Sequence, residues 1–156
     1  MLRISKLADY ATVVMVYLVQ QQDKLCNARD IAKETHLSVP TVSKILKQLT
    51  ASGLLMSVRG VSGGYRLQRS PAAISVSDIL FALEENRGII ECDHKPNDCS
   101  LSHVCRVQSN WRLISRAIES ALSSVSLESL AQPIFSNEHL ERIKQLAMGV
   151  KGESSR

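Results

Sequence analysis

The sequence predicts a mainly α-helical fold with one short β-hairpin near its middle. Apolar residues recur every three or four positions in the first fifty residues and again after residue 105, which is typical of amphipathic helices. Between these regions two short apolar runs flank a glycine-containing turn, residues 61–64, as in a hairpin. The 156 residues, 44% hydrophobic and 22% charged, are enough to bury a core.

The first predicted helix spans residues 5–22. Its buried face is expected to carry Leu7, Tyr10, Val14 and Leu18. The apolar run from Tyr10 to Val19 directly follows Asp9 and is shorter than the roughly 20 residues that cross a bilayer. We therefore expect no membrane span, no secretion signal and a cytoplasmic protein, in which thiols stay reduced.

Two further predicted helices have the pattern of a helix-turn-helix. The second spans residues 28–35, and the third runs to about Ser52 with Ser38 as its N-cap and Pro40 in its first turn. His36 lies where many such turns have glycine, so we expect a slightly different turn. The apolar positions with helix-turn-helix spacing are Ile31, Leu37, Val42 and Ile45. The side chains of this unit expected to reach bases and phosphates are Ser38, Thr41, Ser43, Lys44, Lys47 and Gln48.

The predicted hairpin follows the third helix immediately. Its strands are residues 54–60 and 65–69, and glycines in the turn permit positive φ. A helix-turn-helix followed by a basic hairpin is a winged helix, and Arg69 adds to the positive charge at its end. The residues of this wing expected to contact DNA are Arg59, Ser62, Gly63 and Arg66.

Charge is distributed unevenly along the chain. Residues 1–70 contain 10 Lys/Arg and 4 Asp/Glu, whereas residues 71–156 contain 9 Lys/Arg and 11 Asp/Glu. A basic N-terminal half is typical of a polyanion-binding surface, although a solvated surface can carry the same excess. Together with the winged helix, it predicts binding to double-stranded DNA.

Three cysteines lie within fourteen residues, at Cys92, Cys99 and Cys105, and Cys26 is the fourth in the chain. Thiolates gathered on a polar segment are ligands for a soft metal or an iron–sulfur cluster. Six and five residues separate the three, which is wider than the paired spacing of zinc ribbons, so zinc is the weaker alternative. His94 and His103 are expected to be solvated, and Cys26 to be a buried core thiol.

A long helix is predicted after the cysteine segment, preceded by a linking helix at residues 75–85 and followed by a last helix at 136–148. Winged-helix proteins usually bind paired half-sites as dimers. We therefore expect a homodimer on a pseudo-palindromic site, with the long helix as the dimerisation helix; a packed core helix is the alternative. The apolar stripe of this helix consists of Val107, Trp111, Ile114, Ile118, Leu122 and Val125.

Three segments resemble the IscR, NsrR and RirA type of winged-helix iron–sulfur regulators, the Rrf family. They are the opening Arg3-Ile4-Ser5-Lys6 to Tyr10-Ala11, the wing at residues 57–65 and the three-cysteine loop. The similarity covers residues 1 to about 131 and is greatest to regulators of the SUF cluster-assembly operon. It implies a homodimeric regulator, a repressor of iron–sulfur assembly or stress genes, whose cluster state tunes DNA affinity.

The resemblance implies a cluster held by Cys92, Cys99 and Cys105, with a 2Fe-2S form favoured over 4Fe-4S. IscR-like members have a histidine three residues after the last cysteine, but this chain has Gln108 there. NsrR-like members use a partner-subunit aspartate in the first helix, and Asp9 matches that position. Asp9 is therefore the candidate fourth ligand.

The sequence predicts three parts and no enzymatic motif. Residues 1–72 form the winged helix-turn-helix, 73–131 the linking helix, cluster-binding loop and dimerisation helix, and 132–156 a C-terminal helix and tail. A phosphate-binding glycine loop and a Ser-His-Asp arrangement are both missing from the sequence, so an enzyme is not expected. The alternatives are a zinc- or thiol-based winged-helix regulator and an iron–sulfur protein that does not bind DNA.

Overall fold

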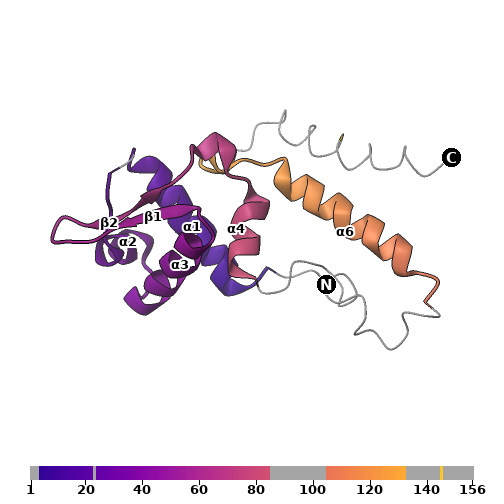
Figure 1. Ribbon diagram of the computed structural model, residues 1–156, viewed down its shortest axis with the longest axis horizontal. Coiled ribbons are helices and arrows are strands. Elements are labelled where there is room, and N and C mark those ends of the chain that lie inside the picture. The colour runs from indigo at the N-terminus through magenta and orange to yellow at the C-terminus, as the bar shows by residue number, and fades with distance from the viewer. Residues whose placement is uncertain (1–3, 23, 85–104, 133–144, 146–156) are drawn as a thin grey trace.

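The computed structural model describes residues 4–22, 24–84, 105–132 and 145. In it the helices α1–α4 and a two-stranded hairpin form a compact body from which a long helix, α6, projects (Figure 1). The mainly α winged helix-turn-helix is therefore confirmed, whereas the predicted helix at 136–148 lies outside the described residues. The elements in chain order are α1 (Lys6–Gln20), α2 (Ala28–Thr35), α3 (Val39–Ala51), β1 (Leu55–Val58), β2 (Gly64–Leu67), η1 (Pro71–Ala73), α4 (Val76–Leu83), α6 (Gln108–Ser123) and α7 (Leu127–Leu130).

Side-chain caps fix where the first three helices begin. Ser5 accepts a hydrogen bond from the Ala8 amide at α1, and Asn27 accepts from two amides at the start of α2. Ser38 caps α3 as predicted, accepting from the Thr41 amide at 3.3 Å. Each cap satisfies amides that have no partner inside their helix.

The turn between α2 and α3 depends on His36. Its backbone has φ 56° and ψ 26°, the left-handed conformation that glycine adopts most readily. Its amide donates to the carbonyls of Ala32 and Lys33 and so ends α2. The turn was expected to differ slightly from one that contains glycine. The difference in backbone conformation is small, because His36 adopts the left-handed conformation that glycine would adopt.

The wing is an antiparallel hairpin whose second strand is also bridged to the α1–α2 connection. In it Leu55 pairs with Leu67 and Val58 with Gly64. Cys26 adds a bridge beyond β2, since its amide donates to the Tyr65 carbonyl at 3.0 Å and the Tyr65 amide returns a bond at 2.9 Å. The end of β2 next to the turn is thus held by backbone hydrogen bonds on both sides of the strand.

Gly64→Ala is expected to destabilise the protein by about 1–3 kcal/mol, the usual cost of forcing an extra methyl group into packed surroundings. An alanine Cβ would lie 2.8 Å from the Cys26 carbonyl oxygen and 3.0 Å from its amide nitrogen, and backbone cannot move aside easily. Urea unfolding would measure the loss. Ser62→Ala, at an exposed tip position, is the control, and equal stability of the two variants would contradict this account of the close approach.

One hydrophobic core joins the winged helix to the elements that follow it. Ile74, Ile79 and Leu127 are fully buried with the core side chains of α1 and α3. The Leu127 amide donates to the Ile74 carbonyl at 2.7 Å and the Val76 amide to the Val125 carbonyl at 2.9 Å. The chain after α6 therefore returns to close the core beside α4, whereas the division at residue 72 stays a prediction.

Helix α6 is amphipathic but contributes no fully buried residue of its own. The C-terminal end of its apolar stripe packs on the core through Leu122 and continues into buried Val125. At the other end Val107, Trp111 and Ile114 are 52%, 44% and 44% exposed. Half of the stripe is thus covered within the chain and half is open. None of the helices in the described part of the chain is long and apolar enough to cross a membrane.

Candidate nucleic-acid interface and metal site

The outward face of α3 carries the lysines predicted from the sequence. Ser43, Lys44 and Lys47 are exposed, because Val42, Ile45, Leu46 and Leu49 take the buried positions of the helix. The two lysines lie within one turn of each other, a spacing that suits contact with neighbouring phosphates.

Three other residues predicted to contact DNA are less available to it, because their side chains have hydrogen-bond partners or are partly buried. The Ser38 and Thr41 hydroxyls are 2.8 Å apart and hydrogen-bond to each other. Gln48 is half-buried, and its Oε1 is buried without a hydrogen-bond partner among the described residues. The structure thus assigns Ser38 a capping role, and contact of these three with DNA stays a prediction.

The wing places its predicted residues in two groups. Arg59 and Ser62 are exposed at the tip. Gly63 is needed for the turn, because a Cβ there would collide with the carbonyl oxygens of Val58 and Gly60. The Arg66 side chain reaches across to its paired residue on β1, with its Nε 3.1 Å from the Met56 sulfur. Arg59 is therefore the predicted wing cation that is free to approach a groove.

Helix α4 is tied to the winged helix at both ends. At its N-terminus Asp78 forms a capping box with Ser75 and lies 3.8 Å from the Arg69 guanidinium, at the end of the wing. At its C-terminus the Glu84 carboxylate accepts a hydrogen bond of 3.3 Å from the Ser5 amide, at the start of α1. Arg69 was expected to add charge to the wing and instead pairs with Asp78. Sequence periodicity gave no signal for either tie, although Ser75 with Asp78 three residues later is a recognisable cap.

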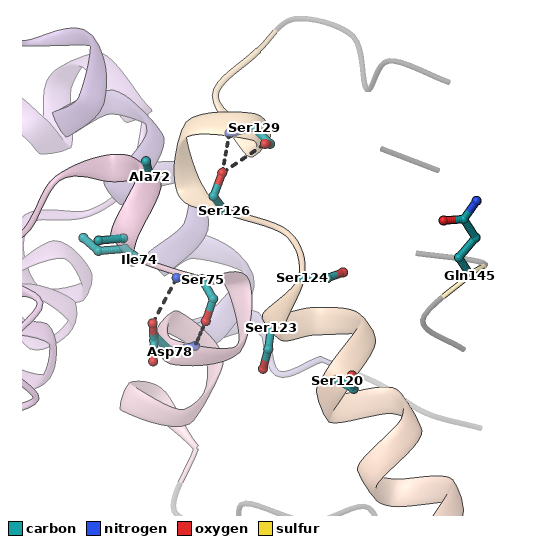
Figure 2. Close-up of a pocket in the computed structure, with 11 residues that line it drawn as sticks. Ala72, Ile74, Ser75, Asp78, Ser120, Ser123, Ser124, Ser126, Ser129 and Gln145 are labelled. Carbon is teal, nitrogen blue, oxygen red and sulfur yellow. Dashed lines mark hydrogen bonds between the residues drawn. The ribbon is translucent and has the colours of Figure 1, made fainter. Parts of the chain in front are cut away.

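A polar cleft of about 860 Å³ opens beside the first of these ties. Figure 2 shows its lining, where the Ser75–Asp78 capping bonds and the Ser126–Ser129 bonds face a space bordered by the C-terminal end of α6. The α3 and wing-tip residues proposed to contact DNA are not part of this lining. The cleft is therefore separate from the candidate DNA interface.

Asp9 lies in the first turn of α1 and is exposed. It shares the outer face of that helix with Val13, 44% exposed, and with half-buried Tyr10 and Tyr17. In Figure 1 the Gln108 end of α6, which follows Cys105, is the end far from α1. The structure therefore does not bring Asp9 of one chain close to Cys105 of the same chain.

The described cysteines, Cys26 and Cys105, are both free thiols. Cys105 is half-exposed just before α6, whereas Cys26 is 7% exposed in the core. Burial raises the pKa of the Cys26 thiol, with a further increase from Asp30, and burial likewise raises the pKa of Tyr17. A protonated, enclosed thiol is a poor ligand. Cys92, Cys99, His94 and His103 lie outside the described residues.

The described residues contain no group of three or more His, Cys, Asp or Glu side chains that could hold a metal ion. Cys105 nevertheless fits the donor chemistry of an iron–sulfur site, because it is a free and accessible thiol that follows the segment carrying the other two. The candidate metal site thus includes residues 92–105, of which the structure describes one.

Curated relatives are transcriptional regulators. The chain is 25% identical over 147 residues to the HTH-type transcriptional regulator NsrR of Halalkalibacterium halodurans, an alignment covering 93% of this chain and 99% of that protein. It is 32% identical over 142 residues to the HTH-type transcriptional regulator IscR of Vibrio cholerae, covering 90% of this chain and 79% of that protein. These relatives support a DNA-binding regulator, and the expectation that the chain is not an enzyme is confirmed.

Two of the solved structures that share this fold are regulators with similar sequence identity to this chain. CymR, the global cysteine regulator of B. subtilis, is 30% identical with a TM-score of 0.65, covering 84% of this chain and 97% of that one. IscR of T. potens is 31% identical with a TM-score of 0.61, covering 83% and 85%. The family model described as Rrf2, iron-dependent transcriptional regulator, matches residues 4–133. The chain therefore belongs to the Rrf2 family of winged helix-turn-helix transcriptional regulators.

Proposed function

We propose that this chain is an iron–sulfur-cluster-containing repressor of iron–sulfur assembly or related stress genes, and that the state of its cluster tunes its affinity for DNA. The observation that carries the proposal is the position of the cysteine segment. The stretch that contains it, residues 85–105, follows Glu84, whose carboxylate accepts a hydrogen bond from the Ser5 amide at the start of α1, and ends at the free thiol of Cys105 before α6. The names of the NsrR and IscR relatives and the iron-dependent description of the family support the same reading.

The DNA-binding part of the proposal places α3 in the major groove and the wing tip in the minor groove. The major groove accepts an α-helix, and its phosphates attract Lys44 and Lys47 on the exposed face of α3. The narrower minor groove attracts a cation such as Arg59, which the hairpin holds at its exposed tip. A dimer would then bind two half-sites separated by about one helical turn or a multiple of it.

Lys47→Ala is expected to weaken binding similarly on all sequences and to reduce the slope of log K against log salt by about one unit. Arg59→Ala is expected also to change the preference for groove width at the edges of the site, because that preference depends on a cation in the minor groove. Fluorescence anisotropy at several salt concentrations, on the promoter region of the chain's own gene, would measure both effects.

Arg116→Ala is the matched control for both variants. It removes the same charge from an exposed position on α6, away from α3 and the wing (Figure 1). If Arg116→Ala reduced the salt slope as much as Lys47→Ala, the phosphate contact would not belong to α3. If Arg59→Ala bound the operator as tightly as the parent, the wing would be only structural.

The metal-binding part of the proposal assigns three thiolates and one carboxylate as ligands. Cys92, Cys99 and Cys105 would hold the cluster, which supplies iron that reacts with oxygen or nitric oxide. Asp9 of the partner chain is the proposed fourth ligand. Its exposure on α1 and the distance of that helix from the start of α6 in one chain support donation across a dimer.

The proposed dimer would cover the apolar surfaces that one chain leaves open. These are the exposed half of the α6 stripe and the outer face of α1 around Val13. A second copy supplies matching surface because a two-fold interface uses the same patch on both chains. Asp9 lies on that α1 face, so the same association would carry its carboxylate toward the partner's cysteine segment.

The ties of α4 provide a route from the cysteine segment to the DNA-binding residues. Glu84 connects the start of that segment to α1, and Asp78 connects the other end of the helix to the wing through Arg69. A ligand set shared between chains would fix the position of one α1 relative to the other, and with it the spacing of the two α3 helices. The two α3 helices would have one spacing when the cluster is bound and another when it is lost. The change in DNA affinity would then depend on how much more tightly one of these two arrangements binds the cluster.

Two other functions make different predictions. A zinc- or thiol-based regulator would be colourless when purified without oxygen, whereas an iron–sulfur protein absorbs visible light. An iron–sulfur protein without DNA binding would not retard its own promoter fragment in a gel. One anaerobic absorption spectrum and one gel shift therefore separate the three, and the exposed α3 lysines favour the DNA-binding forms.

A further inference from the structure

The first turn of α3 presents an apolar corner to solvent. Val39 begins the helix and is 42% exposed, and Pro40 beside it is also exposed. A β-branched side chain at this position is not needed for the core, which α3 fills with Val42, Ile45, Leu46 and Leu49. The N-terminal residues of a recognition helix are those that usually contact base edges. In the proposed placement of α3, Val39 therefore lies where base readout would take place.

The hydroxyl groups near this corner already have partners. The Ser38 hydroxyl caps the helix by accepting from the Thr41 amide at 3.3 Å and lies 2.8 Å from the Thr41 hydroxyl. Pro40 has no amide proton to offer. The chemical groups that this turn offers to a base edge are thus mainly the methyl groups of Val39 and the ring of Pro40.

The first turn of α3 lacks the side chains that discriminate guanine and cytosine best. Val39–Ala51 contains two lysines but no arginine, aspartate or glutamate. Arginine or lysine gives the commonest specific contact to guanine, and carboxylates accept from the cytosine amino group; of these, α3 has only Lys44 and Lys47, which lie beyond its first turn. The Oε1 of Gln48, which an adenine contact would need, is buried. In the first turn of the helix, ahead of Ser43 and the lysines, apolar readout by Val39 is therefore the contact available.

We propose that Val39 reads a thymine in each half-site by packing its methyl groups against the thymine C5-methyl in the major groove. Thymine is distinguished there by that methyl group, and apolar side chains are its usual partners. The inference rests on the proposed placement of α3 in the major groove and goes beyond it by naming the residue and the base atom.

The test replaces single thymines by uracil in a duplex selected from a randomised library by the parent protein. Uracil lacks only the C5-methyl, so hydrogen bonding and charge stay the same. The parent is expected to lose about fourfold in affinity at one thymine in each half-site, the factor that corresponds to burying one methyl-sized group. Val39→Ala is expected to bind the thymine and uracil duplexes equally, and Val39→Ile to retain the preference.

The outcomes separate this inference from the proposed function. If the parent selects a specific duplex but every thymine can be replaced without loss, or if Val39→Ala keeps the same preference, Val39 does not read thymine and DNA binding still stands. If the parent selects no sequence at all, the proposed function fails and this inference with it. Melting followed by circular dichroism should give Val39→Ala and the parent the same Tm, since position 39 is outside the core.

Discussion

Replacing Cys99 by alanine is expected to remove most of the iron and acid-labile sulfide from protein prepared without oxygen, and Cys92→Ala and Cys105→Ala should do the same. Iron–sulfur clusters usually take four ligands. Two thiolates and a carboxylate cannot satisfy those positions, so one lost thiolate removes the site. Iron and sulfide per chain, with the visible absorption spectrum, would measure the loss.

Two variants sharpen the interpretation of this result. Cys26→Ala should keep the full iron content, because the Cys26 thiol is enclosed in the core and hydrogen-bonds to the Lys24 carbonyl. Asp9→Ala should retain part of the cluster but lose it faster in air. Unchanged iron content in all three cysteine variants would contradict the assignment of these cysteines as cluster ligands. Unchanged air stability of the cluster in Asp9→Ala would show that the fourth ligand is another residue.

Ile114→Glu is expected to convert the protein to a monomer and to weaken operator binding about 100-fold or more, which is within the range lost when two linked binding sites are separated. Ile114 lies in the exposed half of the α6 stripe. A carboxylate there would have to be buried without a partner in the dimer, which is costly. Analytical ultracentrifugation and anisotropy titrations on the same sample would measure both effects.

Leu113→Glu is the matched control. Leu113 is also 44% exposed, but it lies outside the stripe formed by Val107, Trp111 and Ile114. It should remain a dimer and bind the operator normally. A monomer for Leu113→Glu together with a dimer for Ile114→Glu would place the interface on the other side of α6.

Local patterns predicted most of the fold. The predicted α2 boundaries, 28–35, coincide with Ala28–Thr35, and Ser38 caps α3 as expected, because caps and apolar periodicity depend on neighbouring residues. The return of the chain at α7 and the bridge from Cys26 to Tyr65 were not predicted. Both depend on hydrogen bonds between residues far apart in sequence, which no local pattern contains.

The candidate site was predictable where exposure follows from periodicity. Lys44, Lys47 and Arg59 are exposed as the sequence suggested. Ser38, Gly63 and Arg66 have structural roles in the cap, the turn and the sheet, because a polar residue type does not reveal which partner it finds inside the fold. The proposed role of Val39 has no such sequence signal, because an apolar residue between Ser38 and Pro40 carries no donor or acceptor that indicates a base contact.

The attachment of the second wing strand to the α1–α2 connection has an evolutionary consequence. Backbone hydrogen bonds between Cys26 and Tyr65 hold β2 next to the turn, whereas positions 58–62 beyond it are exposed. Substitutions at the tip positions other than Gly60, whose φ of 121° favours glycine, can therefore change which DNA edges are recognised while the stability of the domain stays nearly constant. Duplicated copies of such a regulator could acquire new operators through a few tip substitutions, without compensating changes in the core.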